Sequence, residues 1–391
     1  MESNENENGI KFKVNTPIFS YGADTYNDPK NDIYVEPEIR PASIKGMMRY
    51  MFRITQPVMG ISDLLIKENA LFGDAENSAS PVRLAVVDSN KISFEVGKFL
   101  FHDKEGYNPE RKYISSTSEF SIRLKIRKDL DQLNRLRKKS KQGELTELEN
   151  QRLGKLNEKD SKGYLKEESW YESLLDLSFI LIGLGQRSRK GRGRAQIQAS
   201  DYTIDSLKEL LNKVSLSKEA KPYERFKDEK SRDGIRLKES VAKLSSGIKR
   251  PIIEKIIFGN LKKISGEKFL EMVDQASHDI KWEKHDRGKP LKSKLWEKDA
   301  RQIKNIKEGE WIEKRYHATG ESSPRFASSV IVGCIQIGDR IMPTYTCVRP
   351  VIRPMKNDVK RKKIKQEFCC RIDADKEWSA FIEKIEGGGR S

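Results

Sequence analysis

The hydrophobic and polar positions of the chain follow two periods, and each period predicts one kind of element. An alternation of apolar and polar residues predicts four strands in the first half, at 10–14, 80–87, 121–127 and 195–198. Apolar residues three or four positions apart predict two helices, at 44–55 and 169–182. Ser43 is the expected N-cap of the first helix, and Pro57 follows its end.

The second half carries a further set of periodic segments after about residue 202. They predict helices at 204–213, 266–276 and 376–385, an apolar segment at 251–258, and strands at 328–337 and 340–348. Gly338 and Asp339 separate the last two strands, which predicts a hairpin. Pro343 lacks a backbone N–H, and this favours an edge position for the second of these strands.

Residues 129–168 differ from the rest because they are highly charged and nearly free of aromatic side chains. Leucines recur through this segment at helical spacing, at Leu130, Leu133, Leu136, Leu145, Leu148 and Leu153. They predict a helical hairpin that turns near Gly143 and projects as an insertion from the first domain. It is either a solvated spacer or a surface that contacts a partner.

The length of 391 residues predicts two domains, and the change of pattern places them at 1–201 and 202–391.

Composition narrows the class of protein. The chain has 76 Lys and Arg residues against 59 Asp and Glu residues, a net charge of +17. This balance is typical of a nucleic-acid binder, and also of a Lys-rich surface held by ion-pair networks. No apolar run approaches the roughly 18 to 20 residues that span a bilayer, and the acidic, polar start is not a secretory signal.

The four cysteines, Cys334, Cys347, Cys369 and Cys370, show no CxxC spacing. This favours reduced thiols in the cytosol over disulfides or a zinc site. A membrane protein, a small secreted domain and a Cys-rich zinc protein are excluded on these grounds.

The segment between the predicted helix 169–182 and the strand that follows is rich in glycine and arginine. Four glycines allow positive φ angles and close approach of a ligand to the backbone, and the basic side chains favour a run of phosphates. The predicted residues of this glycine-rich loop (residues 183–194) are Gly183, Gly185, Gln186, Arg187, Ser188, Arg189, Lys190, Gly191, Arg192, Gly193 and Arg194. The order helix, loop, strand excludes a P-loop and a dinucleotide fingerprint. A solvated turn that is basic by chance is the alternative.

The start of the helix at 44–55 is a second candidate site. Its first-turn amides, with Arg40, Ser43 and Lys45 nearby, are suited to one phosphate. Arg49 and Arg53 follow Lys45 at a spacing of four residues and extend that basic face along the helix. The alternative is a solvated face above a methionine-rich core.

The sequence offers little for catalysis. The histidines, His102, His278, His285 and His317, form no HExxH motif and no zinc-ligand spacing. His317 beside Tyr316 is either an acid–base pair for RNA cleavage or a polar loop. The run KRKKIK at 360–365 either touches nucleic acid or stays solvated. We therefore predict no catalytic residue, no metal and no cofactor.

Several stretches, in order, resemble the RAMP superfamily of CRISPR proteins, and within it the first-subunit family of the Cmr (type III-B) effector complex. They are TPIFSYGAD (16–24), EIRPASIKGMMRY (38–50), LFG (71–73) with SPV (80–82), GLGQRSRKGRG (183–193) and, in the second half, RFASSV (325–330). Three positions depart from the family pattern. Arg192 replaces an aromatic residue and Arg194 a small residue, which makes this loop more electrostatic and less suited to stacking. Ser329 replaces a proline in the motif of the second half.

The resemblance implies an α+β fold of tandem ferredoxin-like (RRM-like) β-α-β-β-α-β units with a charged helical insertion. The helices at 44–55 and 169–182 would belong to the first unit. It also implies a cytoplasmic, non-catalytic subunit of an antiviral ribonucleoprotein that contacts the guide RNA toward its 3′ part and supports recognition of target RNA. Its partners would be those RNAs and the other RAMP subunits of a Cmr complex. Two alternatives stay open: a metal-independent RAMP-type endoribonuclease that processes CRISPR transcripts, and a general single-strand RNA binder.

Overall fold

The structure is a computed structural model of the 391-residue chain. It describes residues 9–22, 31, 33–75, 79–87, 91–100, 110–198, 200–216, 221–282, 328–349 and 374–387, together with six two-residue strands between 284 and 369. Within these residues, no helix is long and apolar enough to cross a membrane.

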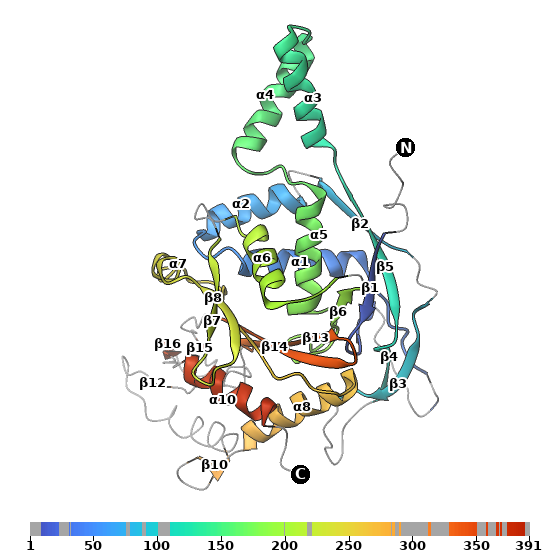
Figure 1. Cartoon of the computed structure of the whole chain (residues 1–391), viewed down its shortest axis with the longest axis vertical. Helices are drawn as coiled ribbons and strands as arrows, with labels where there is room; N and C mark the ends of the chain where they lie inside the picture. The colour runs from blue at the N-terminus through green and yellow to red at the C-terminus, as the bar shows by residue number, and fades with distance from the viewer. Residues whose placement is uncertain are drawn as a thin grey trace.

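The first half of the chain contains both strands and helices (Figure 1). The strands are β1 (Ile10–Val14), β2 (Val82–Val87), β3 (Phe94–Lys98), β4 (Glu110–Ile114), β5 (Glu119–Ile126) and β6 (Ala195–Ile197). The helices are α1 (Pro41–Ile54), α2 (Ile61–Phe72), α3 (Asp129–Gln142), α4 (Glu147–Ser161) and α5 (Glu168–Leu177), which continues as the π-helical segment η4 (Ser178–Ile182).

The second half is organised around one larger sheet. Its main strands are β7 (Tyr223–Lys227), β8 (Asp233–Leu237), β9 (Ile253–Phe258), β13 (Val330–Ile337) and β14 (Arg340–Val348). Its helices are α6 (Ile204–Val214), α7 (Glu239–Leu244), α8 (Gly266–Trp282) and α10 (Ala374–Glu386). The two-residue strands are β10 (Lys284–His285), β11 (Lys289–Pro290), β12 (Ile312–Glu313), β15 (Asn357–Asp358), β16 (Lys365–Gln366) and β17 (Phe368–Cys369).

The first sheet has the antiparallel order β2-β5-β1-β6 and packs against α1 and α5. This confirms the four predicted strands and both predicted helices. The alternating apolar residues of β1 and β5 face the helices, where Phe12 stacks on Phe120 at 5.5 Å between ring centroids and contacts Phe179 of η4. The start of α1 differs from the prediction. Arg40 is the N-cap and Ser43 makes no capping bond, because the helix already begins at Pro41, whose fixed φ suits the first helical position.

The second sheet has the antiparallel order β13-β14-β9-β8-β7. The predicted hairpin is confirmed, with Ile337 opposite Arg340. The predicted edge position of β14 is wrong, because β14 lies between β13 and β9. Thr344 is the first residue of β14 that pairs with β9, so the missing N–H of Pro343 falls just before that ladder begins.

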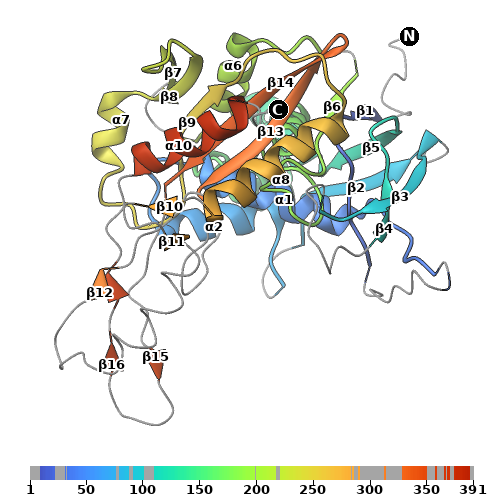
Figure 2. The same ribbon diagram turned by 90° about the horizontal axis from the view of Figure 1, so that it is seen from below.

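The second sheet is covered on both faces. Helices α8 and α10 pack together on one face, where their apolar residues meet those of β13 and β14 (Figure 2). The other face joins a core cluster shared with the first half, and β13 contacts η4 directly. The two halves of the chain therefore share a buried seam along η4 and β13.

Helices α3 and α4 form the predicted hairpin and project away from the two sheets (Figure 1). Gly143 ends α3 in a left-handed conformation, and Leu133, Leu136 and Leu156 make a small buried core of their own. Leu148 does not belong to that core, because its side chain is 78% exposed near the turn.

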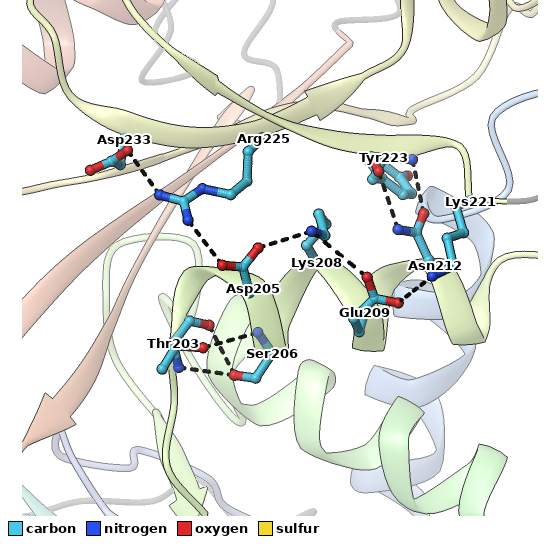
Figure 3. A network of polar contacts seen from close by, with 10 residues as sticks. All are labelled: Thr203, Asp205, Ser206, Lys208, Glu209, Asn212, Lys221, Tyr223, Arg225 and Asp233. Atoms are coloured by element: carbon cyan, nitrogen blue, oxygen red, sulfur yellow. Dashed lines mark hydrogen bonds and ion pairs between the residues drawn. The ribbon is translucent and has the colours of Figure 1, made fainter.

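Polar contacts fix α6 against the edge of the second sheet (Figure 3). The Asn212 side chain exchanges two hydrogen bonds with the backbone of Tyr223, at 2.9 and 3.1 Å. Arg225 of β7 bridges Asp205 of α6 and Asp233 of β8, at 2.9 and 3.2 Å. These contacts set the direction in which the chain leaves β6 and enters the second sheet.

Arg250 ties the second half to the end of α1. Its buried guanidinium donates to the carbonyl of Arg53 in the last turn of α1, and to the carbonyls of Gln56 and Met59 in the segment that joins α1 to α2. Burial lowers the pKa of Arg250 to about 10, so the group stays charged at neutral pH.

Asp176 is a buried carboxyl between α5 and the segment that leaves the first sheet. The Tyr202 hydroxyl donates to it at 2.6 Å and accepts from the Ile197 amide at 3.0 Å. Burial raises the pKa of Asp176 to about 7. The folded state therefore binds this proton more tightly than the unfolded chain, in which an Asp has a pKa of about 3.9.

We expect the stability of the wild-type chain to depend on the protonation of Asp176. The contribution of this carboxyl is complete below its unfolded pKa and is lost as the pH rises through about 7. The variant Asp176→Asn accepts the Tyr202 hydrogen bond without a charge. Thermal midpoints measured at about pH 5.5 and about pH 8 should fall more for the wild type than for the variant. Equal changes in both proteins would show that Asp176 does not titrate in this range.

Candidate nucleic-acid interface

The glycine-rich loop (residues 183–194) connects η4 to β6, and its two ends are hydrogen-bonded to each other. The Gly193 amide donates to the Pro17 carbonyl at 2.9 Å, and the Leu184 amide donates to the Gly193 carbonyl at 2.9 Å. Gly193 has a φ of +72°, and a Cβ there would lie 1.8 Å from the Leu184 carbonyl oxygen. The predicted positive φ is confirmed at all four loop glycines. The close approach at Gly193, however, is to the protein's own backbone rather than to a ligand.

Arg192 is a buried cation paired with a buried anion of the second half. Arg192 and Asp274 of α8 are both 0% exposed, and Arg192 Nη2 lies 2.6 Å from Asp274 Oδ2. Nη2 also donates to the Phe99 carbonyl at 2.8 Å. The predicted phosphate contact of Arg192 is therefore corrected. This guanidinium joins the loop to α8 and does not reach the surface.

Arg194 is also buried, with no carboxylate bonded to it. Its Nη2 donates to the Ser188 carbonyl at 2.9 Å and to the Val332 carbonyl of β13, while Nε and Nη1 have no hydrogen-bond partner among the described residues. Burial lowers the pKa of Arg194 to about 9. Two glycines make room for it, since a Cβ on Gly183 would lie 2.1 Å from Nη1 and one on Gly333 would lie 2.9 Å from Nε. Arg194 is likewise removed from the predicted phosphate contacts.

Two further basic residues of the loop also contact the second half. Arg187 pairs with Asp274 at 3.1 Å and has a positive φ of 52°, which is uncommon for a residue with a side chain. The Lys190 ammonium lies 4.6 Å from the centroid of the Phe381 ring of α10. The Val332 amide donates to the Arg189 carbonyl at 3.1 Å, so the loop backbone pairs with β13.

The outer part of the loop and the start of α1 form one groove, with a volume of about 570 Å³. Its walls contain Phe19, Ser20, Tyr21, Arg40, Ser43, Met47, Tyr50, Ile182, Gly183, Leu184, Gly185, Gln186, Ser188 and Arg189. The two candidate sites, which are far apart in the sequence, are thus brought together in one groove. Of the twelve predicted polar and basic residues, Arg40, Ser43, Gln186, Ser188 and Arg189 line this groove.

Aromatic and polar neighbours orient the side chains at the groove. The Arg189 guanidinium stacks over Tyr50 at 5.1 Å from the ring centroid and donates to its hydroxyl and to the Ser328 carbonyl. Gln186 accepts a hydrogen bond from Arg111 of β4 at 2.8 Å. Sequence reasoning missed Tyr50 and Arg111. Tyr50 ends the EIRPASIKGMMRY motif and was a visible signal, whereas the β3–β4 hairpin that brings Arg111 to the loop has no strong periodicity.

The basic row along α1 does not reach the groove, and this part of the prediction is corrected. Lys45 donates to Ser80 Oγ at 3.0 Å and to the Val82 carbonyl at 2.9 Å. Arg49 and Arg53 both pair with Glu68 of α2, whose carboxylate is 1% exposed. Their role is to dock α2 on α1, because a buried carboxylate is stable only with such partners.

The described residues contain no cluster of His, Cys, Asp and Glu that could hold a metal ion. Cys334 and Cys347 are free and buried, in agreement with the prediction of reduced thiols at these two positions. Burial raises the pKa of both thiols to about 12, so neither is a nucleophile near neutral pH. Tyr316, His317 and the basic run at 360–364 lie outside the described residues.

Comparison with known proteins identifies the class of this domain. A family model described as the RAMP superfamily matches residues 11–196, a segment that contains the first sheet, the start of α1 and the whole glycine-rich loop. Residues 11–196 therefore match the RAMP superfamily, in agreement with the resemblance to that superfamily found in the sequence motifs. A comparison with curated proteins found no match.

Solved structures similar to the chain include subunits of Cmr complexes. Cmr1 from Pyrococcus furiosus, in its apo form, is 15% identical with a TM-score of 0.46, covering 97% of this chain and 95% of that chain. A chain of the type III-B Cmr-beta complex bound to cognate target RNA and AMPPnP in the presence of ssDNA is 15% identical with a TM-score of 0.39, covering 96% of this chain and 98% of that chain. A chain of Cmr-beta bound to cognate target RNA alone is 14% identical with a TM-score of 0.38, with the same coverage.

We expect Asp274→Asn to destabilise the protein strongly, because it leaves Arg192 as a buried charge without an anion. The expected loss in the free energy of unfolding is about 3–5 kcal/mol, measured by urea denaturation. A double variant, Arg192→Met with Asp274→Leu, removes both charges and should recover most of that loss. Asp339→Asn, at the exposed ion pair with Lys263, is the matched control and should have little effect. A single variant as stable as the wild type would contradict the account of the buried pair.

Proposed function

We propose that the protein is a non-catalytic RNA-binding subunit of a type III-B CRISPR (Cmr) ribonucleoprotein and that it holds single-stranded RNA in the groove between α1 and the glycine-rich loop. The observation that carries this proposal is the meeting of the α1 N-terminus with the outer loop in one groove. Both elements belong to the segment that matches the RAMP superfamily. The bound RNA would be the guide RNA toward its 3′ part, and the chain would support recognition of target RNA in antiviral defence.

The groove has the chemistry that an RNA backbone requires. The first-turn amides of Ala42 and Ser43 have no partner inside α1, and the positive end of the helix dipole faces the same place. Arg40 adds a side chain that is 43% exposed, with an ion pair to Glu38 at 3.3 Å that a phosphate would compete with. Arg189 is held over Tyr50 and is thus pre-organised for a phosphate or for stacking on a base. Together, the α1 N-terminus, Arg40 and Arg189 can neutralise about two to three phosphates.

We also propose that both halves are ferredoxin-like units, with the boundary between 1–201 and 202–391. The strand order β2-β5-β1-β6, with α1 and α5 in the crossovers, supports this for the first half. In the second half, when the two-residue strands are set aside, β9, α8, β13, β14 and α10 come in the same order of element types. There β8 occupies the position beside β9 that the fourth strand of such a unit would take.

The partners that follow from this proposal are the guide RNA, the target RNA and the other RAMP subunits of a cytoplasmic Cmr complex. RNA that co-purifies with the tagged chain from its native host tests this directly. Guide-type RNAs should begin with a CRISPR repeat fragment and have stepped 3′ ends. RNA unrelated to repeats would leave a general single-strand RNA binder. Discrete new RNA ends on a denaturing gel, formed in EDTA, would indicate an endoribonuclease.

We expect the double variant Arg40→Ala with Arg189→Ala to weaken RNA binding and to reduce its salt dependence. Loss of two phosphate contacts should lower the magnitude of the slope of log K against log salt by about 1.4, since each contact to a single strand contributes about 0.7. Fluorescence anisotropy of a labelled single-stranded RNA at several salt concentrations measures this slope.

Arg236→Ala is the matched control for that measurement, because it removes an exposed arginine on β8 whose partner is Glu224. Its slope should equal that of the wild type. If the groove variant also kept the wild-type slope, RNA would have to bind elsewhere.

A further inference from the structure

A second surface, distinct from the groove at the loop, is apolar and exposed. Three residues of α2 are exposed, Ile61 at 50%, Leu65 at 49% and Ile66 at 54%, and Leu244 of α7 is 61% exposed. Figure 1 shows α2 and α7 on the same side of the molecule. Exposed apolar side chains scattered singly need no explanation, but several gathered at one place mark an interaction site.

Two cavities lie along α2; Ile66 and Leu244 are among their lining residues, whereas Ile61 and Leu65 line neither. One, of about 470 Å³, is lined by Val58, Met59, Ile66, Leu216 and Leu244 among others. The other, of about 350 Å³, lies at the base of the α3–α4 hairpin. Ile66 and Tyr164 line both cavities, so the two form a continuous apolar depression along α2. We call this depression with its exposed rim the α2 groove.

The charges at the α2 groove are unbalanced. Lys67 lines the first cavity and Lys166 the second, and neither forms an ion pair within the described part of the chain. Lys166 lies 5.8 Å from the centroid of the Trp170 ring, and burial together with the nearby Lys67 lowers its pKa. Asp160 acts on that pKa in the opposite direction, but its carboxylate is already paired with Arg137. Asp63 also lines the first cavity, but it is in the first turn of α2, where the helix dipole stabilises its charge.

The remaining charged residues near the α2 groove already have partners, and they include Asp74, a carboxylate that also lines the second cavity. Arg127 and Lys159, in the second cavity, both contact Asp129. On α7, Lys243 pairs with Glu239 at 2.8 Å. A ligand that complements the α2 groove would therefore present apolar side chains together with carboxylates.

We propose that the α2 groove docks an amphipathic, acidic segment of another protein subunit of the same ribonucleoprotein. This inference rests on the proposed function for the identity of the assembly, but it uses none of the residues of the RNA groove. An apolar face of the segment would cover Ile61, Leu65 and Leu244, and its carboxylates would meet Lys67 and Lys166. RNA fits less well, since four exposed aliphatic side chains offer a phosphate backbone nothing to bind.

Reconstitution of the full chain with guide RNA and the other protein subunits tests the proposal, with incorporation of the chain read by native mass spectrometry. Leu65→Glu and Leu244→Glu should each reduce incorporation at least tenfold, and Lys67→Glu should reduce it less. RNA affinity of the isolated chains should be unchanged. Leu261→Glu, at a leucine 47% exposed outside the α2 groove, is the matched control and should enter the complex like the wild type. Because all these positions are exposed or half-buried, the variants should keep the wild-type thermal midpoint.

The outcomes separate this proposal from the proposed function. A wild-type chain that enters the complex together with equally competent Leu65→Glu and Leu244→Glu chains would overturn the docking surface alone. A wild-type chain that enters no complex would overturn the proposed function and the partner with it. A photo-reactive residue placed at Ile61 should cross-link to a segment of another subunit that is rich in apolar and acidic residues. Cross-links to RNA or to a second copy of this chain would contradict the proposal.

Discussion

The ion pair between Arg192 and Asp274 lies at the seam between the two halves of the chain, and the geometry of the candidate RNA site depends on it. It fixes the inner part of the glycine-rich loop against α8, at 2.6 Å between Nη2 and Oδ2 with both side chains out of contact with water. A buried charge is tolerated only when it is paired and hydrogen-bonded, so this contact leaves the loop few alternatives. Arg194, beneath β13, fixes the end of the same loop. With the inner part fixed, residues 185–189 are presented at the surface beside the first turn of α1.

This arrangement separates two roles that a basic loop combines in its sequence. Arg192 and Arg194 are buried and join the loop to the second half of the chain. Arg187 has a mixed position, because it pairs with Asp274 while its side chain is 31% exposed. Arg189 lines the groove. The count of positive charges in the loop therefore overstates the number of phosphates it can contact. The net charge of +17 likewise overstates the charge available for RNA. Many basic side chains form ion pairs within the protein, as Arg49 and Arg53 do with Glu68. RNA affinity should come from a small number of pre-organised groups.

The hydrophobic periodicity was sufficient to predict the first sheet, its two helices and the α3–α4 hairpin, because each has one buried face and one solvated face. It failed for α2, whose residues Ile61, Leu65 and Ile66 are apolar yet exposed, so that no clean stripe marks the buried face. The short, charged strands β7 and β8 also lack a clear alternation. At the site, the motifs predicted the loop and the helix start as two candidates. They did not predict which arginines are buried, because that depends on Asp274, more than 80 residues further along the chain.

The most direct test of this account is amide hydrogen exchange of the full chain with and without a single-stranded RNA. If RNA binds at the groove, the amides of residues 42–43 and 185–189 should exchange more slowly in the complex. The loop residues 191–194 should be protected already in the free protein, because the buried ion pair and the backbone contacts hold them. Unchanged exchange at 42–43 and 185–189, with new protection at 191–194 or on the α3–α4 hairpin, would contradict the account.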